Sequence, residues 1–138
     1  MDNPRTGNHP PVNVRYRAEA ARLLGFIGSR ETIPFLARLF SRDSESLVKT
    51  AAAEAIGKIG VDPEGLALKT FENAVSPPAP PGDEPALRAV AAATGALCRF
   101  SGPPLSEAGI RILMILSAND RYPLASGQAK KELKSLGR

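Results

Sequence analysis

Residues 48–60, which read VKTAAAEAIGKIG, decide the fold because residues 14–28, VRYRAEAARLLGFIG, are an earlier copy of them. A shift of 32 residues superposes the two stretches, pairing Ala20-Ala21 with Ala52-Ala53, Leu24-Gly25 with Ile56-Gly57, and Ile27-Gly28 with Ile59-Gly60. A fixed period of tens of residues is typical of proteins that stack one supersecondary unit on the next. The repeat therefore predicts an extended array instead of a single closed core.

A longer copy lies further along the chain. A shift of 77 residues superposes a whole helix pair without a gap, placing Ile33 on Ile110, Phe35 on Ile112, Leu36 on Leu113, Leu39 on Leu116, Asp43 on Asp120, Ala52 on Ala129 and Gly60 on Gly137. A more divergent unit lies between the two copies, displaced by about 38 to 40 residues. Apolar residues recur at spacings of three and four in each half, which is the periodicity of amphipathic helices.

This periodicity predicts seven helices, at about 14–27, 31–41, 45–59, 63–75, 85–99, 104–118 and 122–136. The first, third, fifth and seventh are the second helices of their pairs, so the first has no partner before it. We expect an all-α fold, an α-α superhelix of about three and a half repeats over residues 14–138. An extended or disordered lead-in precedes it at 1–13, and a proline-rich loop interrupts it at 76–85.

Small and capping residues fit these helices. Alanine runs and the helical glycines Gly25 and Gly57 predict close crossings between the second helices. Gly28, Gly60 and Gly137 stand where a left-handed cap ends a helix. Asp62-Pro63-Glu64 predicts a helix start with Pro63 at the first position, and Asp43 and Asp120 are matching candidates for the turns within pairs.

The composition leaves little for catalysis. Cys98 is the only cysteine and His9 the only histidine among 138 residues, which excludes an internal disulfide, a multi-histidine metal site and a Ser-His-Asp triad on the helices. Cys98 is interpreted as a small buried hydrophobe, and no phosphate loop is present. We expect no enzyme activity, no cofactor, no metal and no membrane span; the compartment stays open, with the cytoplasm slightly favoured.

Residues 14–28 and 48–60, with Ile33-Pro34-Phe35-Leu36 and Asp43 before the second copy, resemble HEAT repeats. The 32-residue spacing is similar to that of the short repeats found in phycobilisome lyases and in many bacterial proteins of unknown role. The resemblance implies a non-catalytic helical scaffold for protein–protein interaction, as a module of a larger protein. It leaves open two alternatives, namely binding of a nucleic-acid phosphate backbone and a lyase-like or chaperone role beside an enzyme.

Basic residues on the second helices are the candidate partner-binding residues, because these helices line the concave side of such arrays. Arg17 and Lys49 are equivalent under the 32-residue shift and Arg88 lies close to their position, so the three predict a ladder facing an acidic protein surface or a phosphate backbone. Arg15 and Lys130 are further candidates. The alternative is that these side chains solvate the surface and pair with Glu19, Glu45 or Glu54.

Two further features concern the partners. The formal charge of +4 is divided unevenly: residues 1–42 hold seven basic and three acidic residues, residues 43–120 six and ten, and residues 121–138 five and one. This is a pattern of two basic ends, which gives little support to nucleic-acid binding. The first helix presents Leu23, Leu24, Phe26 and Ile27 with one neighbouring pair to bury them, which predicts homo-oligomers through exposed terminal helices.

Overall fold

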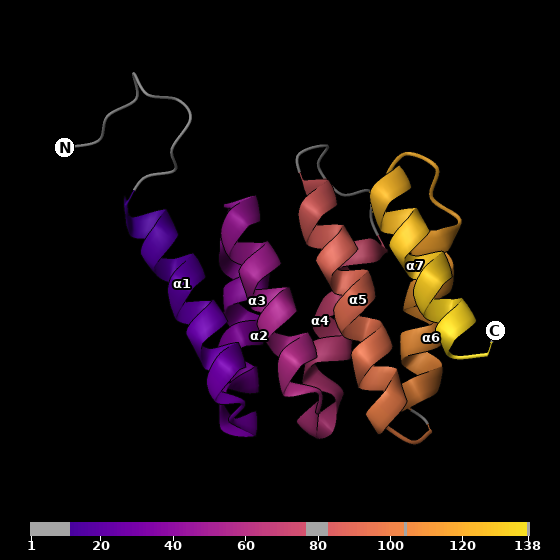
Figure 1. Cartoon of the computed structure of the whole chain (residues 1–138), viewed down its shortest axis with the longest axis horizontal. Helices are drawn as coiled ribbons and strands as arrows, with labels where there is room; N and C mark the ends of the chain where they lie inside the picture. The colour runs from indigo at the N-terminus through magenta and orange to yellow at the C-terminus, as the bar shows by residue number, and fades with distance from the viewer. Residues whose placement is uncertain (1–11, 77–82, 104, 138) are drawn as a thin grey trace.

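The computed structural model describes residues 12–76, 83–103 and 105–137 (Figure 1). Seven α-helices occur in these ranges: α1 (Val12–Ile27), α2 (Ile33–Arg42), α3 (Ser46–Ile59), α4 (Leu66–Val75), α5 (Glu84–Phe100), α6 (Leu105–Ser117) and α7 (Pro123–Ser135). Short 3-10 turns at Arg30–Thr32 and Pro63–Gly65 precede α2 and α4. The all-α prediction is confirmed, and every helix lies where the apolar spacing places it, with its ends shifted by three residues at most.

The helices form two layers. Helices α1, α3, α5 and α7 pack side by side in what we call the front row, and α2, α4 and α6 form the back row (Figure 1). The core lies between the rows and includes Leu36 and Phe71 from the back row and Ile56, Val90 and Leu97 from the front row, all fully buried. The rings of Phe40 and Phe71, 5.4 Å apart and edge to face, join α2 to α4.

Glycines set the spacing of the front row. A Cβ added to Gly25 would lie 2.7 Å from the Cα of Ala55, and one added to Gly57 would lie 3.0 Å from the Cα of Ala93. Both distances run to the backbone of the next helix, which cannot move aside as a side chain can. The prediction of close crossings at these glycines is confirmed, and equivalent atoms meet at both contacts, as successive repeats require.

Burial shows that the gapless 77-residue shift is wrong by one residue for the first helices. The buried residues of α2 are Ile33, Leu36, Ala37 and Phe40, and those of α6 are Gly109, Ile112, Leu113 and Leu116, which is a shift of 76. For the helices of the front row the shift stays at 77 residues, which places Val48 on Ala125 and Ala52 on Ala129. One extra residue in the turn between α6 and α7 accounts for the difference.

The same extra residue moves the turn cap. The Asp43 carboxylate accepts a hydrogen bond from the backbone N–H of Glu45 at 3.0 Å, and the Asn119 side-chain oxygen accepts the equivalent bond from Arg121 at 3.1 Å. Asn119, and not Asp120, is therefore the counterpart of Asp43. Gly28, Gly60 and Gly137 take positive φ values of 81°, 77° and 83° and end their helices as predicted.

The start of α4 is also corrected. The helix begins at Leu66 and not at Pro63, because Glu64 and Gly65 take left-handed conformations with φ values of 62° and 69°. Asp62 caps the helix from four residues upstream: its carboxylate accepts bonds from the backbone N–H groups of Ala67 at 2.7 Å and Leu68 at 2.9 Å. Burial raises the pKa of this carboxyl, although both hydrogen bonds favour the charged form.

Candidate binding groove

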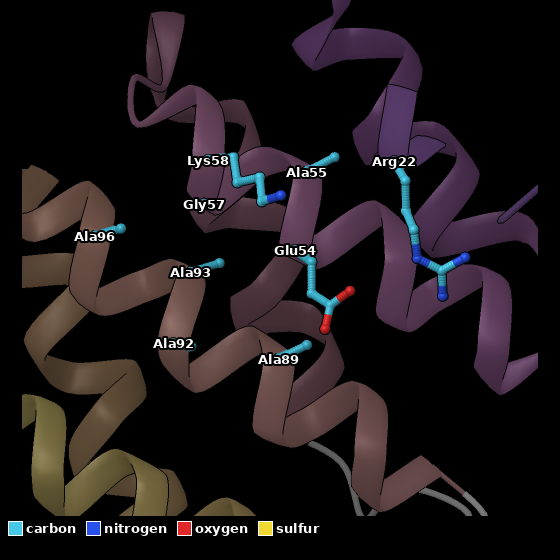
Figure 2. Close-up of a pocket in the computed structure, with 9 residues that line it drawn as sticks. All are labelled: Arg22, Glu54, Ala55, Gly57, Lys58, Ala89, Ala92, Ala93 and Ala96. Atoms are coloured by element: carbon cyan, nitrogen blue, oxygen red, sulfur yellow. The ribbon is translucent and has the colours of Figure 1, made fainter. Parts of the chain in front are cut away.

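A hollow of about 480 Å³ crosses the front row between α1, α3 and α5 (Figure 2). Its floor is made of small residues: Ala55 and Gly57 from α3, and Ala89, Ala92, Ala93 and Ala96 from α5. The four alanines of α5 recur at i, i+3, i+4 and i+7, so they lie on one face of that helix. Because methyl groups stand where longer side chains would fill the space, the row is hollowed here.

Charged side chains form the rim of this hollow. Arg22 comes from α1, and Glu54 and Lys58 come from α3. Figure 2 shows all three beside the alanine floor. Among the residues that the structure describes, Glu54 and Lys58 make no ion pair, and Arg22 makes a long one of 3.8 Å with the exposed Glu19. An exposed pair of this kind contributes little, so the Arg22 guanidinium is available to a ligand.

A second hollow of about 440 Å³ continues the first toward α7. It shares Glu54, Ala89 and Ala92 with the first hollow and adds Thr50, Pro85, Arg88, Leu124 and Gln128. We call the two together the front groove. It touches all four front-row helices, and its rim carries three cations, Arg22, Lys58 and Arg88, against the single anion Glu54.

The five predicted partner-binding residues are not brought together. Arg88 lines the front groove, whereas Arg17 and Lys49 each contact an aspartate that precedes the next front-row helix. The Arg17 guanidinium donates two hydrogen bonds to Asp43, of 2.7 and 3.2 Å, and the Lys49 ammonium lies 3.5 Å from Asp83. Arg15 and Lys130 are exposed and do not line either hollow.

The two ion pairs lower the positive charge that the ladder offers to a partner. Hydrogen bonding from Arg17 is the main cause of a lowered pKa at Asp43, so this carboxylate stays charged at neutral pH. The side chain of Asp43 is 7% exposed and that of Lys49 is 22% exposed, so both pairs are partly shielded from water. These contacts give Arg17 and Lys49 a role in holding successive front-row helices together.

The third member of the ladder is displaced by one residue. Gly57 and Gly95 occupy equivalent positions on α3 and α5, which fixes the shift between these helices at 38. Under this shift Lys49 falls on Leu87, which is buried, and Arg88 is one position further around the helix. One residue rotates a side chain by about 100° on a helix, which turns Arg88 from the ion-pair position into the front groove.

The described residues include no group of three or more His, Cys, Asp or Glu side chains that could hold a metal ion. Cys98 is 7% exposed, its Sγ lies 3.5 Å from the carbonyl oxygen of Ser106, and burial raises the pKa of its thiol. A thiol with a raised pKa is a poor nucleophile at neutral pH. His9 lies outside the described residues, as do positions 77–82 of the predicted proline-rich loop.

Among the helices of the described ranges, none combines the length and the hydropathy that a membrane crossing requires.

The floor of the groove was not predicted from the sequence. The sequence predicts close packing for the alanines of α5, but Ala92 is exposed, while Ala89 and Ala93 are buried. The signal was present in the spacing 89, 92, 93 and 96, which marks one helix face without a large side chain. Which way that face points depends on the rotation of α5 against its neighbours, and the spacing alone does not give this rotation.

Comparison with known proteins gives one family. The model of HEAT repeats matches residues 8–77. No curated protein and no solved structure matches the chain.

Proposed function

Since the chain belongs to the HEAT-repeat family, we propose that it is a non-catalytic scaffold whose front groove binds an acidic segment of a protein partner. HEAT repeats commonly serve as protein-interaction scaffolds, and the family is generally non-catalytic. The single observation that carries the proposal is the front groove, with its alanine floor and its excess of cations on the rim.

The shape of the groove supports a short segment as the ligand. Each hollow has a volume within the range of about 300 to 1,000 Å³ that is usual for ligand sites. An alanine floor offers apolar contact without long side chains to displace, and Leu124 adds an exposed apolar group at one end. A segment that places apolar side chains on the floor and carboxylates near Arg22, Lys58 and Arg88 satisfies both features.

Charge reversal on the rim tests the proposal. Peptides selected on the protein from a random display library should be rich in Asp and Glu. The triple variant Arg22→Glu, Lys58→Glu, Arg88→Glu should weaken their binding at least about tenfold, measured by fluorescence anisotropy. The matched control is Arg38→Glu, Lys69→Glu, Arg111→Glu, which makes the same change of charge at exposed back-row positions and should leave the affinity unchanged.

Filling the floor tests the shape separately from the charge. Ala92→Trp should block binding while the net charge stays the same, because the indole occupies the part shared by both hollows. Asn73→Trp, at an exposed position of α4, is the control. Equal binding by the Ala92 and Asn73 variants would remove the front groove as the binding site.

Phosphate-backbone binding is the main alternative to the protein partner. Pairing of Arg17 with Asp43 and of Lys49 with Asp83 leaves this row with fewer free cations for a polyanion. A random DNA duplex that binds tightly at low salt, with an affinity that falls steeply as salt is added and is lost in the rim triple variant, would favour the alternative over the proposal.

A further inference from the structure

The face of α1 that points away from α3 carries a stripe of large exposed apolar side chains. Val12, Tyr16, Leu23, Phe26 and Ile27 are 53%, 71%, 58%, 81% and 62% exposed. The residues that pack on α3 are on the opposite side of the helix, namely Val14, Ala18, Ala21 and Gly25. At about 100° per residue the centres of the two sets are half a turn apart. We call the exposed set the α1 stripe.

Five large apolar side chains on one helix face are more than scattered surface residues. The two aromatic side chains alone offer about 300 Å² at these exposures, and the three aliphatic ones bring the α1 stripe to about 500 Å², the size of a patch that usually has a partner. Residues 1–11 contain no Leu, Ile, Val, Phe, Tyr or Trp that could cover it. The eleven residues before α1 therefore offer the α1 stripe no large aliphatic or aromatic side chain of these types.

Four of the five residues of the α1 stripe are placed symmetrically along the helix, whereas Phe26 has Asn13 at its mirror position. Val12 and Ile27 are equally far from the midpoint between Glu19 and Ala20, and so are Tyr16 and Leu23. We propose that a second copy of this chain covers the α1 stripe, with the two α1 helices packed antiparallel about a two-fold axis near Ala20. A two-fold interface uses the same surface on both copies, and the symmetric placement of Val12, Tyr16, Leu23 and Ile27 lets each of them meet an apolar residue of the other copy.

This register places four apolar side chains of each copy opposite apolar side chains of the other. Tyr16 of each copy lies at the level of Leu23 of the other, and Val12 at the level of Ile27. Ala20 lies near the axis, where a small residue lets the two helices approach closely. Glu19 also lies near the axis, so the carboxylates of the two copies come within about 1.5 Å of the same level and repel each other, while Arg22 of each copy comes within two residues, or about 3 Å, of the level of the other Glu19 and can pair with it.

Charge argues against stacking of the α1 stripe on the other end of the array. The exposed face of α7 carries Lys130, Lys131 and Lys134, with no exposed large apolar residue in the same turns. A head-to-tail contact would place these lysines next to Arg15 and Arg22 of α1, which are also exposed. Like charges would repel and the apolar side chains would be covered by ammonium groups, so a closed dimer is favoured over an open filament.

The area sets the expected strength. Two α1 stripes bury about 1,000 Å² in total, which is at the lower limit for a specific interface. We therefore expect a reversible dimer that dissociates on dilution into the micromolar range.

Sedimentation with a matched pair of variants tests the dimer. The wild-type chain should sediment as a dimer at about 100 μM and shift toward monomer below about 1 μM. Leu23→Arg should be monomeric throughout, with unchanged helical circular dichroism, because Leu23 is exposed and makes no core contact. Met114→Arg, at an equally exposed position of α6 with 58% exposure, should dimerise like the wild type.

Cysteine cross-linking tests the antiparallel register. Under mild oxidation Ala20→Cys should give a covalent dimer, because the two new thiols face each other near the axis. Val12→Cys should not, since its two copies lie about 22 Å apart along the helices. The wild-type chain is the control for Cys98, which is buried.

Three results would overturn the proposal. They are a wild-type chain that stays monomeric at the highest concentration, a Leu23→Arg variant that associates as the Met114→Arg variant does, and equal cross-linking of the Ala20 and Val12 variants. Equal cross-linking would indicate a parallel arrangement, and species larger than a dimer would indicate stacking of unlike ends.

Discussion

The two end helices of the front row, α1 and α7, have the same place in their repeats but different surroundings. Helix α1 packs on α3 through Gly25 and Ala55, an apolar contact in which the backbones nearly touch. Helix α7 packs on α5 with the Glu132 side chain over Gly95, at the position where the earlier contacts have alanine. Glu132 is 7% exposed and accepts hydrogen bonds from Arg99 at 2.6 Å and Gln128 at 2.8 Å.

The outward faces of α1 and α7 also differ in polarity. Helix α1 presents the apolar α1 stripe to water, whereas α7 presents lysines. Terminal repeats of helical arrays need a polar outer face to remain soluble, and α7 meets this need while α1 does not. The outward faces of the first and last front-row helices are therefore opposite in character, one apolar and one charged.

The largest expected difference between the two ends is in how stability responds when one glycine on α1 and one on α7 are replaced by alanine. Gly25→Ala should lower the free energy of unfolding by about 2 kcal/mol or more, because its Cβ would overlap the Ala55 backbone. Gly127→Ala should instead raise it by about 0.5 to 1 kcal/mol, since nothing lies within 4 Å of a Cβ there and alanine is the better helix former. Urea unfolding measures both, and effects of the same sign would contradict the close contact at Gly25.

Removing the buried Glu132 carboxylate tests the contact between α7 and α5, and it should change the free energy of unfolding less than Gly25→Ala does. Glu132→Ala should cost about 1 to 2 kcal/mol, because Arg99 and Gln128 lose their partner and the space over Gly95 empties. Arg99→Ala should cost less, since the arginine side chain is 40% exposed. A double-mutant cycle measures the coupling, and a coupling near zero would mean that Glu132 is held by packing alone.

The ion pair between α1 and Asp43 should show the smallest effect, and it should depend on pH. The pKa of Asp43 is lowered from its ordinary value of 3.8, so the charged carboxylate is bound more tightly in the folded state. The stabilisation is therefore complete above about pH 4 and is lost as the pH falls through the lowered folded-state pKa. The free energy of unfolding of the wild type should exceed that of the Asp43→Asn variant by about 1 kcal/mol at pH 7, and this difference should shrink below pH 4. A difference that is constant with pH would show that the charge does not contribute.

The parts of the fold that depend on neighbours along the chain were predicted from the sequence. The spacing of Ile33, Leu36 and Phe40 defines a helix because a turn of 3.6 residues brings them to one side. Gly60 ends α3 because a left-handed residue is needed there. The close crossings at Gly25 and Gly57 also followed, because a glycine weakens the helix that contains it but leaves room for a neighbouring backbone.

The parts of the site that depend on how one helix is rotated against another were not predicted. The repeat spacing groups Arg88 with Arg17 and Lys49, but in the structure a one-residue difference in register separates it from them. The 77-residue shift predicts Asp120 as the counterpart of Asp43, but Asn119 has that role. In both cases the predicted register between repeats is off by one residue, because turn length is where such repeats vary most.

The order of residues along the chain was enough to establish that paired amphipathic helices stack in a row, because periodicity and helix caps act within about ten residues of chain. The packing of the helices against one another decided which cations are paired and which remain free, and where alanines leave a groove. Those outcomes depend on groups that approach from different helices, and a shift of one residue turns a side chain by about 100°, from an ion pair into the groove.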